Sequence, residues 1–221
     1  HNPTGFILPT GDFEQLIEIC RERGIYILSD EVYRGVELRA EDRLPQIADV
    51  YERGISLNVM SKAYGMPGLR IGWIASKDKK LLRKVERYKH YLSICNSAPA
   101  ELLAEMALKS RESLLERNRE LLQRNVEQLE ALFADYPNLV EWHRPRGGCV
   151  AFPRYSGPGD CETFCRALLE ESGVLLLPSS IYVSELADVP SDHFRIGFGR
   201  GEVFQTGLAV MRDHIDGHRS N

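Results

Sequence analysis

The sequence contains no run of about 18 apolar residues, so no segment is expected to cross a membrane. It does not open with a basic stretch followed by an apolar one, so no secretory signal is expected. Neither sign of charge dominates, because 28 basic and 32 acidic residues leave a net charge of −4. Such a balance offers no general attraction to nucleic acid. We therefore expect no membrane or nucleic-acid partner.

Cysteine is sparse, and its five copies are scattered without a C-x-x-C motif. This usage favours free thiols in a reducing compartment such as the cytoplasm over a disulfide framework. Two pairs have the four-residue spacing of zinc ligands on a helix, Cys161 with Cys165 and His214 with His218. A zinc site needs a third and a fourth ligand, and Gly217 is expected to interrupt the histidine turn. No metal site is predicted.

What is present is the patterning of an α/β protein. An apolar stripe predicts a helix over residues 10–23, and a short buried strand follows at 25–29. Further strands are predicted at 55–60 and 71–75. Short strands separated by helix-length segments predict parallel βαβ units with helices on both faces of the sheet.

The second half has a different texture. Residues 97–135 have a helical pattern with a break near Ser110, and a smaller α+β unit is predicted beyond them. We therefore divide the chain into residues 1–112 and residues 113–221. The strands predicted in the second unit are 139–142, 149–153, 174–177 and 194–198, and its helices are 160–172 and 202–215.

One lysine stands apart from the others. Six of the seven lysines lie within residues 77–109, where the basic run 76–90 has the pattern of a solvated helix face. Lys62 instead follows an apolar strand in Ser61-Lys62-Ala63-Tyr64-Gly65, at the strand end where α/β sheets bind ligands. Partial desolvation with Arg70 nearby would free its amine for Schiff-base chemistry.

Two further motifs carry polar groups at turns. Asp30 ends the first strand, so its carboxylate is expected at the same sheet edge as Lys62. For two adjacent acids, a capping role for Asp30 or Glu31 is the simpler interpretation. The opening His1-Asn2-Pro3-Thr4-Gly5 is typical of a turn.

Taken together and in this order, the motifs resemble those of the class I and II aminotransferases, which use pyridoxal phosphate and have the fold-type-I architecture. The resemblance spans essentially the whole chain. It implies the C-terminal part of a large, mainly parallel α/β/α domain (1–112) and a small α+β domain (113–221). The matching motifs are Asn2-Pro3-x-Gly5, Asp30-x-x-Tyr33, Ser61-Lys62, Gly68-x-Arg70-x-Gly72, Gly147-Gly148 and Phe194-Arg195-Ile196.

The resemblance implies a role for each residue toward pyridoxal phosphate. Lys62 is the implied Schiff-base lysine and proton carrier, and Asp30 the partner of the protonated pyridine nitrogen. Asn2 and Tyr33 are implied to hydrogen-bond the 3′ oxygen of the ring, and Arg70 to bind the phosphate.

The resemblance also implies a substrate site and a reaction. Arg195 would clamp the substrate α-carboxylate, with Asn2 assisting. The implied reaction moves an amino group between an amino acid and a 2-oxo acid. A homodimer is implied as well, because active sites of this family are typically built at a dimer interface.

The sequence departs from the family pattern in three places. Val59 stands where the family often has Ser or Gly, so Ser61 is the remaining hydroxyl candidate for the phosphate. Ser179 follows Pro178 where a glycine is often found. The family's N-terminal arm and about half of its large domain, including a phosphate-cradling helix start, are also missing. We therefore expect these residues to be part of a longer chain, inactive alone.

Other functions remain open on the same motifs. Lys62 and Asp30 handle the cofactor without deciding which bond breaks, so a lyase, racemase, decarboxylase or amino-acid oxidase is an alternative. The pyridoxal-phosphate-sensing domain of a transcription regulator is another, although no basic helix-turn-helix segment is found in residues 1–221. A catalytically dead homologue is disfavoured by the joint presence of Lys62, Asp30, Tyr33, Arg70 and Arg195.

Overall fold

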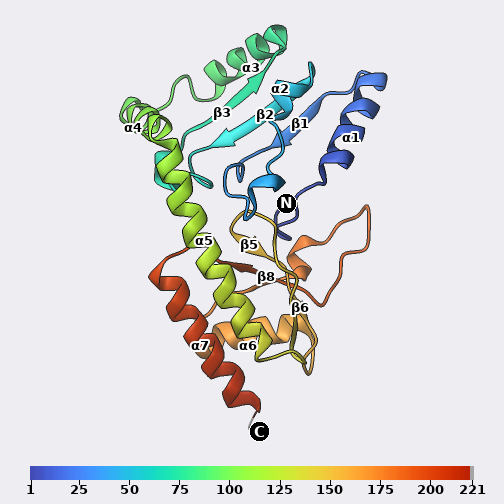
Figure 1. The fold of residues 1–221 in the computed structure, drawn as a ribbon, viewed down its shortest axis with the longest axis vertical. Coiled ribbons are helices and arrows are strands. Elements are labelled where there is room, and N and C mark those ends of the chain that lie inside the picture. Colours follow the sequence, from blue (N-terminus) through green and yellow to red (C-terminus); the bar gives the residue numbers. More distant parts are fainter. Residues whose placement is uncertain (220–221) are drawn as a thin grey trace. The chain divides into compact units, whose positions relative to one another are not determined.

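The computed structural model describes residues 1–219 and groups the chain into two compact units (Figure 1). One unit is Ile7–Arg119, and the other joins His1–Phe6 to the chain from Glu120 onward. The boundary falls within the long helix α5 (Arg111–Ala134). None of the helices within residues 1–219 has the length and apolar character needed to span a membrane.

The unit Ile7–Arg119 is built on a three-stranded sheet of order β1-β2-β3. β1 (Ile27–Asp30) and β2 (Gly54–Val59) are parallel, as predicted. β3 (Gly72–Ser76) is antiparallel to β2, so the prediction of parallel pairing is wrong for this strand. The connection from β2 to β3 contains only the 3-10 helix Pro67–Leu69 and lacks the helical crossover that a parallel return requires.

Helix α1 (Thr10–Arg23) packs its apolar stripe into the first core of this unit. Phe13, Ile17 and Cys20 are buried there together with Ile47 and Tyr51. The helix ends at Gly24, whose φ of 64° lies in the left-handed region that glycine adopts without a steric penalty. The remaining short helical elements before β2 are the 3-10 helix Ala40–Asp42 and α2 (Ile47–Val50).

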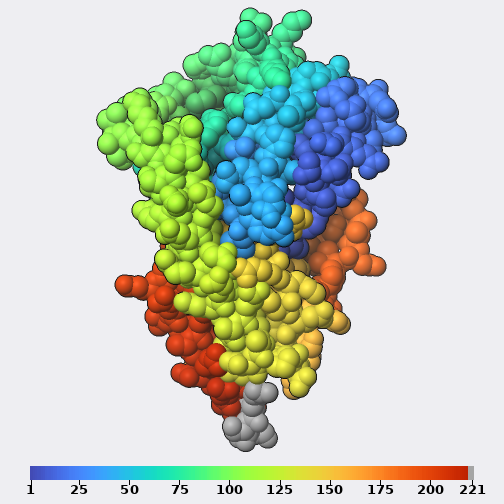
Figure 2. Space-filling view, in the orientation of Figure 1, coloured from blue at the N-terminus to red at the C-terminus, as the bar shows by residue number. Residues whose placement is uncertain are grey.

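Helix α3 (Lys79–Leu92) is a surface helix (Figure 2). The Asp78 side chain caps it by accepting hydrogen bonds from the backbone amides of Lys80 and Leu81. None of its residues is buried, which confirms the prediction of a solvated basic face. α4 (Ala98–Lys109) follows, and the predicted helix break lies at Ser110.

The second unit has two antiparallel sheets made of short strands. β5, β7 and β8 form one antiparallel sheet of order β5-β8-β7, and β4 pairs with β6. Each predicted element has a counterpart in the structure, although the strand predicted at 174–177 overlaps β7 (Leu177–Pro178) only at Leu177. The bounds are β4 (Val140–Glu141), β5 (Val150–Ala151), β6 (Arg154–Tyr155), α6 (Cys161–Ser172), β7 (Leu177–Pro178), a 3-10 helix (Ser179–Tyr182), β8 (Phe194–Gly197) and α7 (Glu202–Arg219).

The core of this unit joins α5 to β8. Leu129 and Phe133 on α5 are fully or almost fully buried, as are Phe194 on β8 and Leu168 on α6. The rings of Phe133 and Phe194 meet edge-on with centroids 6.4 Å apart. This packing anchors the strand that bears Arg195.

Candidate active site

Two loops at the carboxyl ends of β1 and β2 carry the predicted cofactor residues. Asp30 is the last residue of β1 and lies opposite Leu57 of β2, while Lys62 follows β2 in a turn. Because β1 and β2 are parallel, both loops leave the same edge of the sheet. The backbone amide of Ala63 donates to the carbonyl of Val32 over 3.2 Å, which ties the loops together.

The Lys62 amine lies beside an aromatic ring. Its Nζ is 5.9 Å from the centroid of the Tyr33 ring. The Lys62 side chain is exposed, so the expected partial desolvation is not found. Ser61 next to it is half-buried. Burial raises the pKa of the nearby Tyr64 hydroxyl, which keeps its neutral form.

The two adjacent acids at the end of β1 have different partners. Glu31 Oε1 accepts hydrogen bonds from the backbone amide of Ile47 at the start of α2 (2.9 Å) and from Ser56 Oγ (2.8 Å). Asp30 is exposed, and its Oδ1 accepts only a long bond of 3.3 Å from the amide of Val32. The capping role therefore falls to Glu31, and the Asp30 carboxylate faces solvent.

Arg70 follows the 3-10 helix Pro67–Leu69 with an unusual backbone conformation. Its φ of 55° lies in the left-handed region, which costs a residue with a side chain about 1 kcal/mol or more. The side chain is exposed, and Nη1 donates to the carbonyl of Pro67 over 3.2 Å. The exposed guanidinium has further N–H donors that could bind an anionic ligand.

In the other unit, the structure brings together the two residues predicted to bind substrate. Nη1 of Arg195 donates to Oδ1 of Asn2 over 3.2 Å. The opening turn is held against the loop before β5, because the amide of Arg146 donates to the carbonyl of Gly5 over 2.9 Å. Gly5 has a φ of 67°, and a Cβ there would collide with Pro145, so only glycine fits this approach.

A purely structural role for Arg195 would be an ion pair with a neighbouring acid on the surface, and none is formed within residues 1–219. Asp192, the nearest acid in sequence, instead binds Arg154 over 2.6 Å and His193 over 2.7 Å. Within residues 1–219, no carboxylate forms an ion pair with Arg195. Its guanidinium, half-buried and hydrogen-bonded to an amide oxygen, keeps donors for an anionic ligand.

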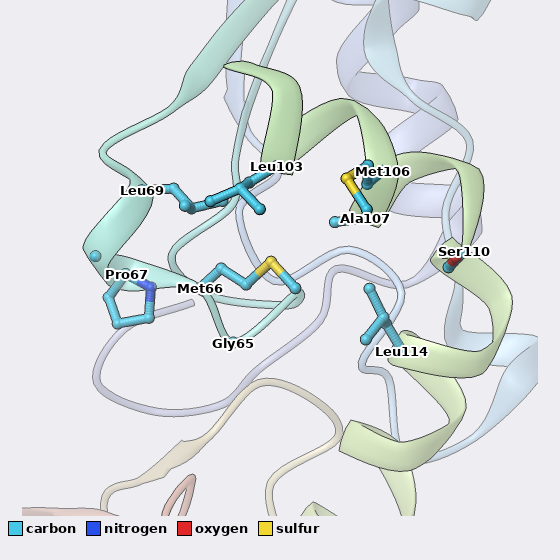
Figure 3. Close-up of a pocket in the computed structure, with 10 residues that line it drawn as sticks. Gly65, Met66, Pro67, Leu69, Leu103, Met106, Ala107, Ser110 and Leu114 are labelled. Carbon is cyan, nitrogen blue, oxygen red and sulfur yellow. The ribbon is translucent and has the colours of Figure 1, made fainter. Parts of the chain in front are cut away.

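A hollow of about 590 Å³ lies near the turn that follows Lys62 (Figure 3). Met66, Leu103, Met106 and Leu114 point toward it, and its lining is almost entirely apolar. None of the predicted site residues lines this hollow. A site for an anionic, polar ligand requires converging polar groups, so this hollow is not the candidate active site.

Sequence reasoning missed three residues on α5 that position the site. Asn118 Nδ2 donates to the carbonyl of Ala63 over 2.7 Å, and Arg119 Nη1 to that of Gly35 over 3.0 Å. Asn125 is 1% exposed and donates to the carbonyls of Phe198 and Arg200, both over 2.7 Å. In the sequence, only Asn125 gave a sign of such a role, because it is a polar residue within the apolar stripe of the helix.

A family model described as aminotransferase class I and II matches residues 1–205. The chain belongs to this aminotransferase family. The recognition made from the motifs is thereby confirmed.

Individual relatives of this aminotransferase chain have several names. It is 27% identical to capreomycidine synthase of Streptomyces vinaceus, over 99% of this chain and 54% of that protein. It is 30% identical to an aspartate aminotransferase of Thermotoga maritima, over 83% of this chain and 47% of that protein. The chain thus spans about half the length of the curated relatives it matches.

Solved structures confirm the fold. A PLP-dependent aminotransferase from Streptococcus suis superposes with a TM-score of 0.86 at 36% identity, covering 96% of this chain and 54% of that one. Aspartate aminotransferase from Thermotoga maritima gives a TM-score of 0.78 at 26% identity. The predicted α/β architecture of the fold-type-I enzymes is therefore correct.

Proposed function

We propose that this chain is part of a pyridoxal-phosphate-dependent aminotransferase that moves an amino group between an amino acid and a 2-oxo acid. The observation that carries the proposal is the link between the loops after β1 and β2, which places Asp30 and Lys62 at one sheet edge. Membership of the aminotransferase family supports it. The pairing of Arg195 with Asn2 supports the amino-acid substrate.

Lys62, Asp30 and Arg70, all in the unit Ile7–Arg119, fit pyridoxal phosphate by their chemistry. An exposed amine, a solvent-facing carboxylate and an exposed guanidinium match its aldehyde, its ring nitrogen and its phosphate. When bound, this cofactor supplies an aldehyde that condenses with amines and a ring that accepts electrons from the substrate.

Each side chain then has a defined task in the proposal. Lys62 holds the cofactor covalently and moves the proton at the substrate α-carbon. Asp30 accepts a charge-assisted hydrogen bond from the ring nitrogen and keeps it protonated. Tyr33 donates to the ring oxygen, and Arg70 binds the phosphate. The Ser61 hydroxyl is a second donor to that phosphate, because Val59, where the family often has Ser, has no hydroxyl.

The substrate side of the proposal rests on Arg195 and Asn2. The planar guanidinium matches a carboxylate with two parallel hydrogen bonds. Asn2, already bonded to Arg195, fixes the orientation of the guanidinium, and its amide is a further donor to the ring oxygen. Both partners, the amino acid and the 2-oxo acid, carry the α-carboxylate that this pair would bind.

The wider assignments are proposals too. We assign residues 1–112 to the large domain and 113–221 to the small one, and we expect a homodimer, which sedimentation of the purified protein tests. A reducing compartment such as the cytoplasm is supported by the five cysteines, which form no disulfide with one another.

Labelling the cofactor lysine tests the proposal. Borohydride reduction of the protein that contains this chain, loaded with pyridoxal phosphate, should add the cofactor mass to the Lys62 peptide. Lys62→Ala should abolish the label and lower turnover by orders of magnitude, because the covalent catalyst is lost. Lys109→Ala is the matched control, since Lys109 is an exposed lysine paired with Glu105. A label on Lys77 or Lys109 would contradict the assignment.

Measuring both products distinguishes amino transfer from other reactions. With an amino acid and a 2-oxo acid supplied together, a new 2-oxo acid and a new amino acid should form in equal amounts. The name of the relative capreomycidine synthase shows that not every match is called an aminotransferase. Consumption of the amino acid without formation of the second one would indicate a different pyridoxal-phosphate reaction.

A further inference from the structure

Two histidines and a glutamate meet where α6 and α7 pack side by side (Figure 1). His214 and His218 lie one turn apart on α7, and Glu171 lies near the end of α6. Gly217 was predicted to interrupt this helix, and the prediction is wrong, because α7 continues through Gly217 to Arg219. The two rings therefore share one helix face, with centroids 4.3 Å apart.

The spacing of the three side chains matches a metal coordination sphere. Oε2 of Glu171 is 3.5 Å from Nδ1 of His214 and 3.2 Å from Nε2 of His218. The three ligand atoms all lie within 4.8 Å of one another. Two ligands bound to zinc at about 2.0–2.1 Å with a tetrahedral angle lie about 3.4 Å apart. The two distances from Glu171 are close to this value, so modest side-chain movement would let the three atoms surround one ion.

A hydrogen bond behind the cluster prepares His218 for coordination. Its Nδ1 lies 2.9 Å from the carbonyl oxygen of His214. Because a carbonyl oxygen only accepts, Nδ1–H is the donor of this hydrogen bond. Metal-binding histidines commonly use their second ring nitrogen in this way, which fixes the tautomer. The other ring nitrogen, Nε2, then faces the carboxylate of Glu171 over 3.2 Å, on the side where a metal ion would be shared by the three side chains.

We propose that Glu171, His214 and His218 bind one divalent transition-metal ion of the zinc class. Imidazole nitrogen and carboxylate oxygen are ligands that such ions accept, with water completing the sphere. The His214 side chain is 7% exposed, whereas those of Glu171 and His218 are 52% and 57% exposed, so the ion has an open side. The bound ion joins α6 to α7 and stabilises this unit.

Calorimetric titration with zinc chloride tests the site on the metal-free, untagged protein. We expect one ion per chain, and a rise in the melting temperature by mass action. Because even outer partners of a metal site contribute tenfold or more, His218→Ala and Glu171→Gln should each weaken binding by about tenfold or more. His143→Ala is the matched control, since His143 is an exposed histidine beside Glu141.

Cobalt substitution identifies the ligands. Coordination by Glu171 and the two histidines should give visible absorption without a sulfur-to-cobalt charge-transfer band. Glu171→Gln keeps the shape of the side chain, so its loss of binding cannot be attributed to unfolding, and circular dichroism checks both variants. Absence of stoichiometric binding, a thiolate band, or unchanged binding in both variants would overturn the proposal.

Discussion

Asp30 and Glu31 are neighbours in sequence, yet their surroundings predict opposite effects of substitution. Asp30→Ala removes an exposed carboxylate with one weak partner and should leave the free energy of unfolding nearly unchanged. It should weaken cofactor binding and slow proton abstraction, because the ring nitrogen loses its charged acceptor. Cofactor titration and single-turnover rates measure the effect.

Glu31→Ala supplies the control for that prediction. It leaves the Ile47 amide and the buried Ser56 hydroxyl without their acceptor, at a cost of about 1–3 kcal/mol in unfolding free energy. A fully stable Glu31→Ala that has lost turnover, beside an active Asp30→Ala, would mean that Glu31 is the cofactor acid.

Arg195 is the residue whose substitution best separates an amino-acid enzyme from a general cofactor binder. Arg195→Lys keeps the charge and loses the two parallel hydrogen bonds. The half-saturating concentrations of amino acid and 2-oxo acid should both rise, while the absorption spectrum of the bound cofactor stays the same. Amines without a carboxylate should react as before. Equal losses for both kinds of substrate would show that Arg195 supports the fold only.

A strained residue follows the end of helix α3, which ends at Leu92. Ile94 has a φ of 59°, a conformation that is rare for a β-branched side chain, and its amide donates to the carbonyl of Lys89 over 2.9 Å. Its side chain is 69% exposed, so little packing is lost on removal. Ile94→Gly should therefore raise the free energy of unfolding by about 0.5–1 kcal/mol, measured by urea unfolding.

Tyr88→Gly, within helix α3 itself, is the control. Tyr88 is 72% exposed and has a normal helical conformation, so glycine there should lower stability by about 0.5–1 kcal/mol. Destabilisation by both substitutions would show that Ile94 is not strained.

Stability of the whole molecule should fall in acid, because both units hold carboxylates with lowered pKa values. The Tyr26 hydroxyl lowers the pKa of Asp78, and the Thr163 amide that of Asp160. Such groups bind protons more readily in the unfolded chain. Their contribution is complete above an unfolded pKa of about 4 and disappears as the pH falls through the lower folded values. Urea unfolding midpoints across this range measure the decline.

Asp160→Asn isolates one of these groups. Asparagine caps a helix about as well as aspartate, so stability at neutral pH should change little. The decline in acid should become shallower, because one titrating group is gone. If stability falls with pH as steeply in the variant as in the unchanged protein, Asp160 does not contribute to the loss of stability in acid.

Patterns local in the chain were sufficient to predict much of this protein. The helix 10–23 has the predicted bounds, the strand predicted at 25–29 overlaps β1, and Lys62 follows β2 as predicted. Each of these features depends on residues adjacent in sequence. The order of the motifs was enough to recognise the family, because their spacing along the chain is itself the signature.

Features that depend on distant residues became visible only in the folded chain. The antiparallel β3 depends on the path of its connection, and the capping role of Glu31 on Ser56 and the start of α2. The third ligand beside His214 and His218 lies on another helix. Hydrogen bonds and coordination act over a few ångströms in space, and a sequence states no distance between residues that are far apart along it.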